Sequence, residues 1–321
     1  MIKPLLHLPR HGFSSEVDLS NLKALLETKH AVLWLDIQDP MPEELALLER
    51  EFGFHELALE DVAHPHERPK LEEYEQHYFL VFYSVGLTEE DEPILAELDL
   101  FVGANYVVAV HRQPIPEIEE AANRWQHNQA LLEHGVGALV HALLDSVVDG
   151  YFRVADRVAE RVGELEEAIF RGADQQTLQE VFILKKRLLG LRRLLGPERD
   201  VLNVLLRRDL PFLDSRTVVY LRDVYDHLAR ITDVVDLQSD LLTSVMDVYL
   251  SSVSNRLNQI VKTLTSVTII LMTVTLVASI YGMNFRNVPE FEWSYGYPWA
   301  LSLMAILSVG LYILLRRRDW L

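Results

Sequence analysis

The sequence predicts an α/β domain at the N-terminus, followed by a long helix and two membrane-spanning helices at the C-terminus. Three observations support this fold class. Up to about residue 113, strand-like runs alternate with helix-like runs, which is typical of α/β domains. Residues 212–281 contain neither glycine nor proline over 70 positions. Residues 263–285 and 293–315 each contain no charged residue over 23 positions.

Residues 1–135 are assigned to the α/β domain. Runs rich in β-branched and aromatic residues predict strands, and the last two runs, which turn at Gly103, predict a hairpin. Pro42, followed by two acidic residues, predicts the start of a helix that ends at Gly53. The predicted strands are 31–37, 77–85, 97–102 and 106–110, and the predicted helices are 42–52, 56–62 and 117–133.

The remainder of the chain is predicted to be helical. Residues 136–210 are assigned to antiparallel cytosolic helices at 136–170 and 175–208, and we expect the second to be interrupted near Pro197. A continuous helix over residues 211–281 would be roughly 100 Å long, too long to be buried in one small domain. We therefore expect a stalk that continues into the membrane as the first span.

The two uncharged runs predict a hairpin of membrane-spanning helices, because about 20 helical residues cross the hydrocarbon core. Residues 282–297 are assigned to an external loop, residues 298–315 to the second span and residues 316–321 to a basic cytosolic tail. Arg256 and Lys262 precede the first span, so the positive-inside rule places both chain ends in the cytoplasm. The expected location is the cytoplasmic (inner) membrane. Two buried hairpin helices of a soluble protein are the alternative interpretation.

Composition narrows the class of function. The sequence has 30 Lys and Arg against 48 Asp and Glu, a formal charge of −18, and an acidic surface repels phosphate backbones and attracts cations. The absence of cysteine excludes disulfides, thiolate metal sites and cysteine nucleophiles. A phosphate-binding glycine-rich loop, a Gly-x-Ser-x-Gly elbow and a His-Glu-x-x-His motif are also absent. We therefore expect cations as partners, and neither nucleic-acid binding nor enzymatic activity.

The predicted stalk carries polar residues with a seven-residue period. Asp226, Asp233, Asp240 and Asp247 lie on one line, which continues into the first span. This period is typical of helices that supercoil with the repeated positions facing their partners, and polar residues at membrane depth normally face a bundle interior or a water-filled path. The positions that we assign to this polar seam, with Leu264 as a constriction if it turns inward, are Asp247, Ser251, Ser254, Asn258, Val261, Leu264, Thr265, Thr268, Met272, Thr275 and Ser279.

The polar seam has more than one interpretation. Two spans cannot enclose a channel, so a pore requires a symmetric homo-oligomer in which each seam position forms a ring. Alternatively, the Ser and Thr hydroxyls bond to carbonyls of their own helix and the Asp residues form a solvated face. A membrane-anchored cation sensor that does not conduct also fits a two-span topology, although a polar seam that continues through the bilayer favours a pore.

A short motif, Gly282, Met283 and Asn284, closes the first span, and a basic cluster ends the chain. With this triplet in this place, the chain resembles the CorA family of divalent-cation transporters over nearly its whole length. The resemblance implies a funnel-shaped homopentamer with an α/β cytosolic domain. It also implies uptake of hydrated Mg²⁺, and often of Co²⁺ or Ni²⁺.

The resemblance implies roles for residues along the pore. Asn284 would form the outer selectivity ring, its amide oxygen accepting hydrogen bonds from the water shell of the ion, while Gly282 and Met283 shape that mouth. Val261 departs from the bulkier methionine of some members. The pore-lining positions of the family fall on Asn258, Val261, Leu264, Met272 and Thr275, and Asp247 guards the cytosolic end.

A regulatory site is also implied by the resemblance. Asp61 and Asp223 match carboxylates that bind regulatory Mg²⁺ between neighbouring subunits, and Glu60 lies beside that site. Acidic faces of adjacent subunits repel each other, so a bound divalent cation would bridge them. Its loss at low cytosolic Mg²⁺ would loosen the closed ring.

Zinc is the alternative cargo, because a related branch with the same triplet carries it. The sequence has 12 histidines, among them His64 and His66, but neither predicted span contains one. Magnesium prefers octahedral oxygen ligands and gives up water reluctantly, whereas zinc prefers nitrogen and sulfur. The polar seam offers oxygen, so Mg²⁺ is the expected main cargo, with Co²⁺ or Ni²⁺ as further candidates.

Overall fold

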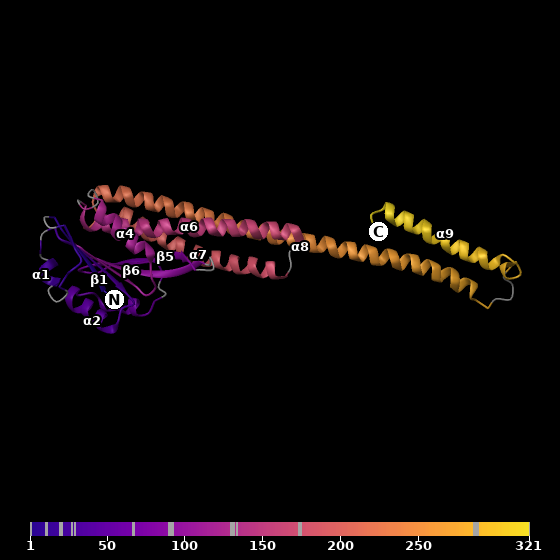
Figure 1. Ribbon diagram of the computed structural model, residues 1–321, viewed down its shortest axis with the longest axis horizontal. Coiled ribbons are helices and arrows are strands. Elements are labelled where there is room, and N and C mark those ends of the chain that lie inside the picture. Colours follow the sequence, from indigo (N-terminus) through magenta and orange to yellow (C-terminus); the bar gives the residue numbers. More distant parts are fainter. Residues whose placement is uncertain are drawn as a thin grey trace. The chain divides into compact units, whose positions relative to one another are not determined.

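Figure 1 shows the computed structural model of the chain. It describes residues 2–9, 12–18, 22–26, 28, 30–65, 68–88, 93–128, 132, 134–172, 175–284 and 289–320. Residues 285–288 of the expected external loop, His66 and Leu321 lie outside the described residues. The chain divides into two compact units, Met1–Thr243 and Ser244–Leu321.

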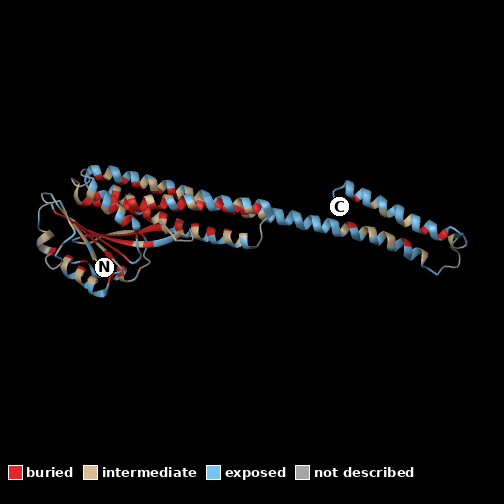
Figure 2. Ribbon diagram, in the orientation of Figure 1, coloured by how far each residue is buried: buried red, intermediate tan, exposed pale blue. Residues whose placement is uncertain are grey.

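The first unit is built on a mixed β-sheet. The described strands form a seven-stranded sheet in the order β2-β1-β3-β7-β6-β5-β4, in which β3 and β7 are parallel and the other neighbours antiparallel. Figure 2 shows that its central strands are buried. The strands are β1 Ile2–Leu8, β2 Gly12–Ser14, β3 Val32–Gln38, β4 Lys70–Glu73, β5 Tyr78–Leu87, β6 Pro93–Val102 and β7 Tyr106–His111.

The four predicted strands correspond to β3, β5, β6 and β7. β6 and β7 pair as the predicted hairpin, with Val102 opposite Val107. The sequence pattern does not reveal β1, β2 or β4. β2 and β4 form the edges of the sheet, and edge strands are short and carry polar residues. β1 lies next to an edge and fully buries only Leu6, so its apolar pattern is weak as well.

Helices cover both faces of the sheet (Figure 1). Leu33 of β3 belongs to a core that includes Leu48 of α2, whereas the neighbouring Trp34 contacts Trp125 of α4, with ring centroids 6.2 Å apart. This alternation follows the two-residue period of a strand. α2 ends at Gly53, as predicted, because its φ of 67° lies in the left-handed region that favours glycine. These helices are α1 Leu22–Leu26, α2 Pro42–Phe52, α3 Glu56–Ala63 and α4 Pro116–His127, the last shorter than predicted.

Three long helices complete the first unit. They are α6 Gly135–Gly172, α7 Gln175–Arg207 and the first part of α8 Ser215–Tyr281. Within this unit they run alongside one another (Figure 1), and Arg192 of α7 pairs with Asp236 of α8 at 3.0 Å. α8 begins at Ser215 because the Asp214 carboxylate caps the helix, accepting the backbone N–H of Thr217 at 2.6 Å.

The predicted interruption near Gly196 and Pro197 is wrong. α7 continues from Gln175 to Arg207 with Pro197 inside it. Proline in a helix interior costs about 3 kcal/mol, because it removes a hydrogen bond and crowds the preceding turn. The side chains of Leu195 and Leu202 on either side of the proline are buried, so tertiary packing outweighs the local penalty.

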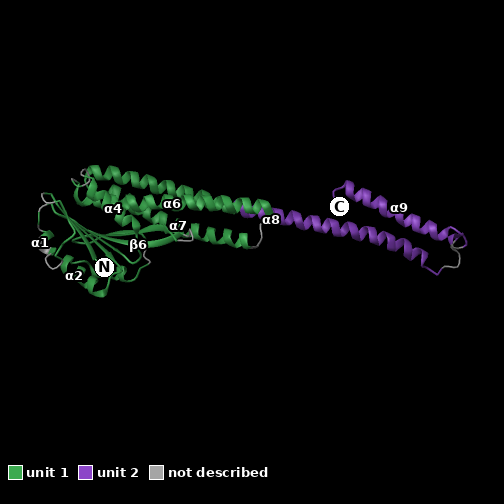
Figure 3. Ribbon diagram, viewed as in Figure 1, with its two compact units in different colours: residues 1–243 green, residues 244–321 purple. Residues whose placement is uncertain are grey.

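The second unit contains the outer part of α8 and α9 Gly296–Arg317 (Figure 3). Both helices are long and apolar enough to cross a membrane. The start of α9 requires glycine at position 296, because a Cβ there would lie 2.0 Å from the carbonyl oxygen of Glu290 in the 3-10 turn Pro289–Phe291. Beyond the end of α9, the main-chain oxygen of Trp320 accepts a hydrogen bond from Ser266 Oγ at 3.3 Å.

Candidate functional site

The predicted pore positions lie in the exposed outer part of α8 (Figure 2). All eleven seam positions from Asp247 to Ser279 are exposed except Thr265, which is half-buried. The two bulky apolar positions, Leu264 and Met272, are 66% and 70% exposed. The single chain therefore leaves these side chains available for contact with other molecules.

A separate face of α8 is used inside the second unit. Ser266 and Val277 are 0% and 8% exposed, and their spacing of eleven residues returns to the same side of a helix with about 3.6 residues per turn. Ser266 Oγ hydrogen-bonds to the carbonyl oxygen of Trp320. At about 100° per residue, the seam positions Leu264 and Thr275 point roughly 160–180° away from Ser266. These two seam positions are thus on the side of α8 opposite the packed face.

Two seam hydroxyls bond to their own helix. Thr268 Oγ1 donates to the carbonyl oxygen of Leu264 at 2.8 Å, and Thr275 Oγ1 donates to that of Leu271 at 2.9 Å. These bonds are the ones that the alternative, non-pore interpretation expects. They are also compatible with a pore, because a hydroxyl that has donated its proton presents only acceptor lone pairs outward. Such oxygens can accept hydrogen bonds from the water shell of a cation.

The Gly-Met-Asn triplet lies where α8 ends. The backbone N–H of Gly282 donates to the carbonyl oxygen of Ala278 at 2.9 Å, and that of Met283 donates to Ile280 at 3.3 Å. The side chains of Met283 and Asn284 are exposed. The last carbonyls of a helix carry a partial negative charge that favours cations. The amide of Asn284 therefore follows a helix end whose partial negative charge favours a cation.

Glu60 and Asp61 lie near the end of α3 in the first unit. The Asp61 side chain is half-buried, with 22% of its surface exposed. Its Oδ2 lies 2.7 Å from Nζ of Lys70. The same ammonium lies 3.4 Å from Oε1 of Glu72. Glu60, the preceding residue, is exposed. This acidic end of α3 is thus held by a lysine from the neighbouring strand β4.

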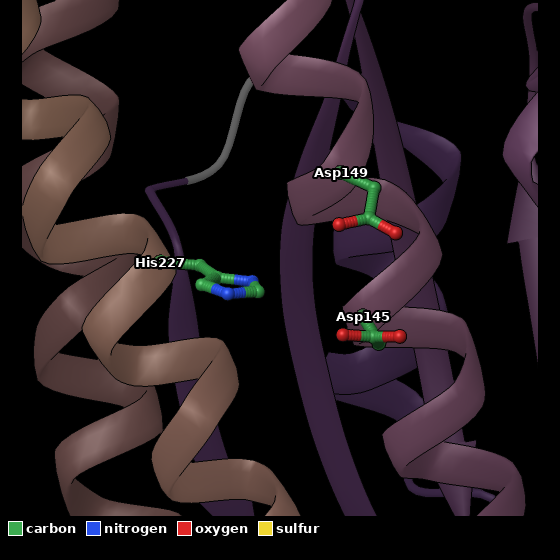
Figure 4. A group of neighbouring side chains, drawn as sticks. All are labelled: Asp145, Asp149 and His227. Carbon is green, nitrogen blue, oxygen red and sulfur yellow. The ribbon is translucent and has the colours of Figure 1, made fainter.

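A cluster of possible metal ligands joins α6 and α8. Figure 4 shows Asp145 and Asp149 of α6 facing His227 of α8, and their ligand atoms all lie within 4.8 Å of one another. Arg124 donates to Asp145 Oδ2 at 2.6 Å and to Asp149 Oδ2 at 2.9 Å. Burial raises the pKa of Asp145, an effect that the nearby His141 opposes and the Asp149 carboxylate reinforces. Asp223, at 70% exposed, lies 3.8 Å from Nε2 of His227.

Comparison with known proteins identifies the family. The family described as CorA-like Mg²⁺ transporter protein matches residues 29–317. The chain belongs to this CorA family. It is therefore a membrane transporter of divalent cations, and the prediction that it is not an enzyme is confirmed. The predicted fold class, an α/β domain with a long helix and two C-terminal apolar helices, is confirmed by likeness to solved CorA structures.

Individual relatives cover most of the chain. The cobalt/magnesium transport protein CorA of Thermotoga maritima is 34% identical over 275 residues, which cover 84% of this chain and 78% of the relative. A putative metal ion transporter of Bacillus subtilis, YfjQ, is 36% identical over 288 residues, covering 89% of each chain. The complete structure of the CorA magnesium transporter from Methanocaldococcus jannaschii covers 100% of this chain and 99% of its own, with a TM-score of 0.87 and 25% identity.

Within this CorA-family chain, the predicted regulatory residues occupy different helices. Glu60 and Asp61 belong to α3, and Asp223 belongs to α8. In the part of the chain that the structure describes, the single group of three possible ligands is Asp145, Asp149 and His227, which includes none of them. Sequence reasoning missed this group. Its available signal was the spacing of four residues from Asp145 to Asp149, which places two carboxylates on one helix face.

Proposed function

We propose that the chain assembles into a homopentamer whose α8 helices line a pore for hydrated Mg²⁺, in the cytoplasmic membrane with both termini in the cytoplasm. The main support is that ten of the eleven seam positions are exposed, and that Leu264, Thr268 and Thr275 lie on the side of α8 opposite Ser266. A membrane helix with Thr and Asn side chains on an otherwise unoccupied face needs a polar environment. Copies of the same helix around an axis supply it.

The chemistry of the seam suits a cation that keeps its water. Mg²⁺ dehydrates reluctantly and prefers oxygen ligands. The Thr268 and Thr275 hydroxyls already donate their protons to α8 carbonyls, so their free lone pairs would accept from the water shell. A ring of Asn284 amides is neutral, so it would bind a hydrated ion weakly enough to release it, as conduction requires. Co²⁺ and Ni²⁺ are further candidate cargoes.

Apolar rings would provide the gate. Leu264 and Met272 are exposed on the seam, and in a ring such side chains form constrictions that can close by dewetting. Val261 is smaller, so its ring would constrict the pore less than a methionine. The hydrated cation would pass when these rings move apart and stop when they meet.

Regulation would depend on carboxylates at subunit boundaries. We infer that Asp61, with Glu60 beside it, and Asp223 of a neighbouring subunit bind cytosolic Mg²⁺ and hold the closed ring together. Oxygen donors of this kind fit Mg²⁺. Asp223 is 70% exposed, as a residue that meets another subunit would be in a single chain. When internal Mg²⁺ falls, repulsion between the acidic faces would favour the open arrangement.

Ion flux in proteoliposomes tests the pore. We expect Asn284→Ala to lower Mg²⁺ flux or its selectivity by about tenfold or more, the order of one lost filter interaction. Asn255→Ala is the matched control, because Asn255 is an exposed asparagine of α8 that is not one of the seam positions. Equal flux and equal ion selectivity in wild type and Asn284→Ala would refute the filter.

The same assay separates the alternatives. Mg²⁺, Co²⁺, Ni²⁺ and Zn²⁺ are compared in parallel at equal concentration. A Zn²⁺ flux above the Mg²⁺ flux would refute magnesium as the main cargo. Complete absence of flux from correctly inserted wild-type protein would refute conduction and favour the non-conducting sensor.

A further inference from the structure

Lys70 forms an ion pair with the carboxylate to which we assign cation sensing. Its Nζ lies 2.7 Å from Oδ2 of Asp61 and 3.4 Å from Oε1 of Glu72. The Lys70 and Asp61 side chains are only 26% and 22% exposed, so the pair is less screened by water than a surface salt bridge. Strand β4 thus places a monovalent cation directly against the acidic end of α3.

Further contacts orient the Lys70 ammonium. It lies 5.8 Å from the centre of the Phe79 ring, within the range of a cation–π interaction. Glu72, its second partner, accepts a hydrogen bond from Tyr74 Oη at 2.9 Å, and the Tyr74 ring stacks on His55 with centroids 4.7 Å apart. Residues of β4, β5 and the loop before α3 therefore hold this lysine in place beside Asp61.

We propose that Lys70 is a built-in competitor of the divalent cation at Asp61, and that it sets the Mg²⁺ concentration at which the sensor responds. The inference rests on the regulatory role proposed above for Asp61, and it adds a residue that opposes binding there. The ammonium and a divalent cation require the same carboxylate oxygens. For Mg²⁺ to bind, Lys70 must leave Asp61 or share it, and two cations at one carboxylate repel each other.

Competition raises the Mg²⁺ concentration at which the sensor site fills. A carboxylate site without a competing cation fills at a lower Mg²⁺ concentration, so it stays filled when internal Mg²⁺ falls. A lysine that reoccupies Asp61 favours the ion-free state and raises the midpoint of the response. The two proposed ligands differ in how closely a basic side chain approaches them. Asp61 Oδ2 lies 2.7 Å from Nζ of Lys70, whereas Asp223 Oδ2 lies 3.8 Å from Nε2 of His227.

Protease protection of α8, measured in the full-length protein as Mg²⁺ is titrated, tests the proposal. We expect Lys70→Gln to lower the midpoint concentration about tenfold, which corresponds to about 1.4 kcal/mol. Lys70→Arg keeps the positive charge, so its midpoint should stay within about twofold of wild type. The control Arg50→Gln removes an exposed cation that pairs with Glu51, and it should leave the midpoint unchanged.

The direction of the shift separates competition from a purely structural role. Loss of a stabilising ion pair would loosen the domain and move the midpoint upward, so a Lys70→Gln midpoint equal to or above that of wild type would overturn the inference. Asp61→Asn distinguishes the two proposals. If Asp61→Asn shifts the response and Lys70→Gln does not, sensing at Asp61 stands and competition is refuted. If Asp61→Asn changes nothing, both are refuted.

Discussion

Glu198 of α7 carries a carboxyl group in the core of the first unit. It is 0% exposed. Tyr151 Oη of α6 lies 2.9 Å from both carboxyl oxygens, and the backbone N–H of Tyr83 in β5 donates to Oε1 at 3.0 Å. Burial raises the pKa of Glu198 from 4.5 to about 8, and the hydrogen bonds from Tyr151 and Tyr83 oppose only part of this shift. The folded protein therefore holds Glu198 protonated at neutral pH.

This shift makes the stability of the fold depend on pH in a defined direction. Below about pH 4.5, Glu198 is protonated in both the folded and unfolded states, and it adds no pH dependence. Between about pH 4.5 and 8, the unfolded state alone is ionised, so the free energy of unfolding falls by about 1.4 kcal/mol per pH unit. The shift of 8 − 4.5 = 3.5 units gives a total loss of about 5 kcal/mol above pH 8.

Glu198→Gln removes this loss. The amide has the shape of the protonated acid and keeps an oxygen for the N–H of Tyr83, so we expect the variant to gain several kcal/mol relative to wild type between pH 5 and 8. Thermal unfolding of the full-length protein in detergent, followed by circular dichroism at several pH values, measures the difference. Glu160→Gln is the control, because Glu160 is 66% exposed.

Two outcomes would refute this reasoning. The first is an unfolding temperature that changes with pH equally in wild type and in Glu198→Gln. The second comes from infrared spectroscopy at pH 7, where wild type should show the carbonyl band of a protonated carboxyl and the variant should lack it. Identical spectra would mean that Glu198 is ionised in the folded protein.

Two further substitutions test local packing and capping by thermal unfolding. Gly150→Ala should destabilise the protein by roughly 1–3 kcal/mol, because a Cβ there would lie 2.9 Å from Oε1 of the buried Glu117. Gly163→Ala in the same helix is the control. Its Cβ would meet nothing within 4 Å, so this variant should be neutral or stabilising. Asp214→Ala should cost about 1 kcal/mol, because its carboxylate accepts the backbone N–H three residues later at the start of α8, whereas the exposed Asp209→Ala should have little effect. Similar unfolding temperatures within either pair would contradict the respective argument.

The parts of the fold that local patterns encode could be predicted from the sequence. β5, β6 and β7 are central strands with mostly buried residues, so their apolar runs are long and distinct. The edge strands β2 and β4 have no such run. The continuity of α7 through Pro197 could not be predicted, because it depends on packing against other helices rather than on local propensity.

The same distinction between local pattern and tertiary packing applies to the candidate site. The polar seam is a property of one helix, so its seven-residue period can be read directly from the sequence. The pair of Lys70 with Asp61 joins a helix to the strand that follows it, and the group of Asp145, Asp149 and His227 joins two helices far apart in sequence. Their proximity depends on how strands and helices pack, and a single sequence without its fold does not contain that information in a local pattern.

The polar residues of α8 change from carboxylates to neutral side chains toward its end, and this change has a physical cause. Asp226, Asp233, Asp240 and Asp247 are all exposed and spaced seven residues apart, but the seam carries no carboxylate from Ser251 to Ser279. A carboxylate at membrane depth costs several kcal/mol to desolvate, whereas Thr and Asn oxygens keep acceptor capacity at a smaller cost. In the proposed pore, the carboxylates would therefore concentrate cations before the membrane segment, and neutral oxygens would carry them through it. This division explains why a filter at the far end of α8 would use the Asn284 amide rather than a carboxylate.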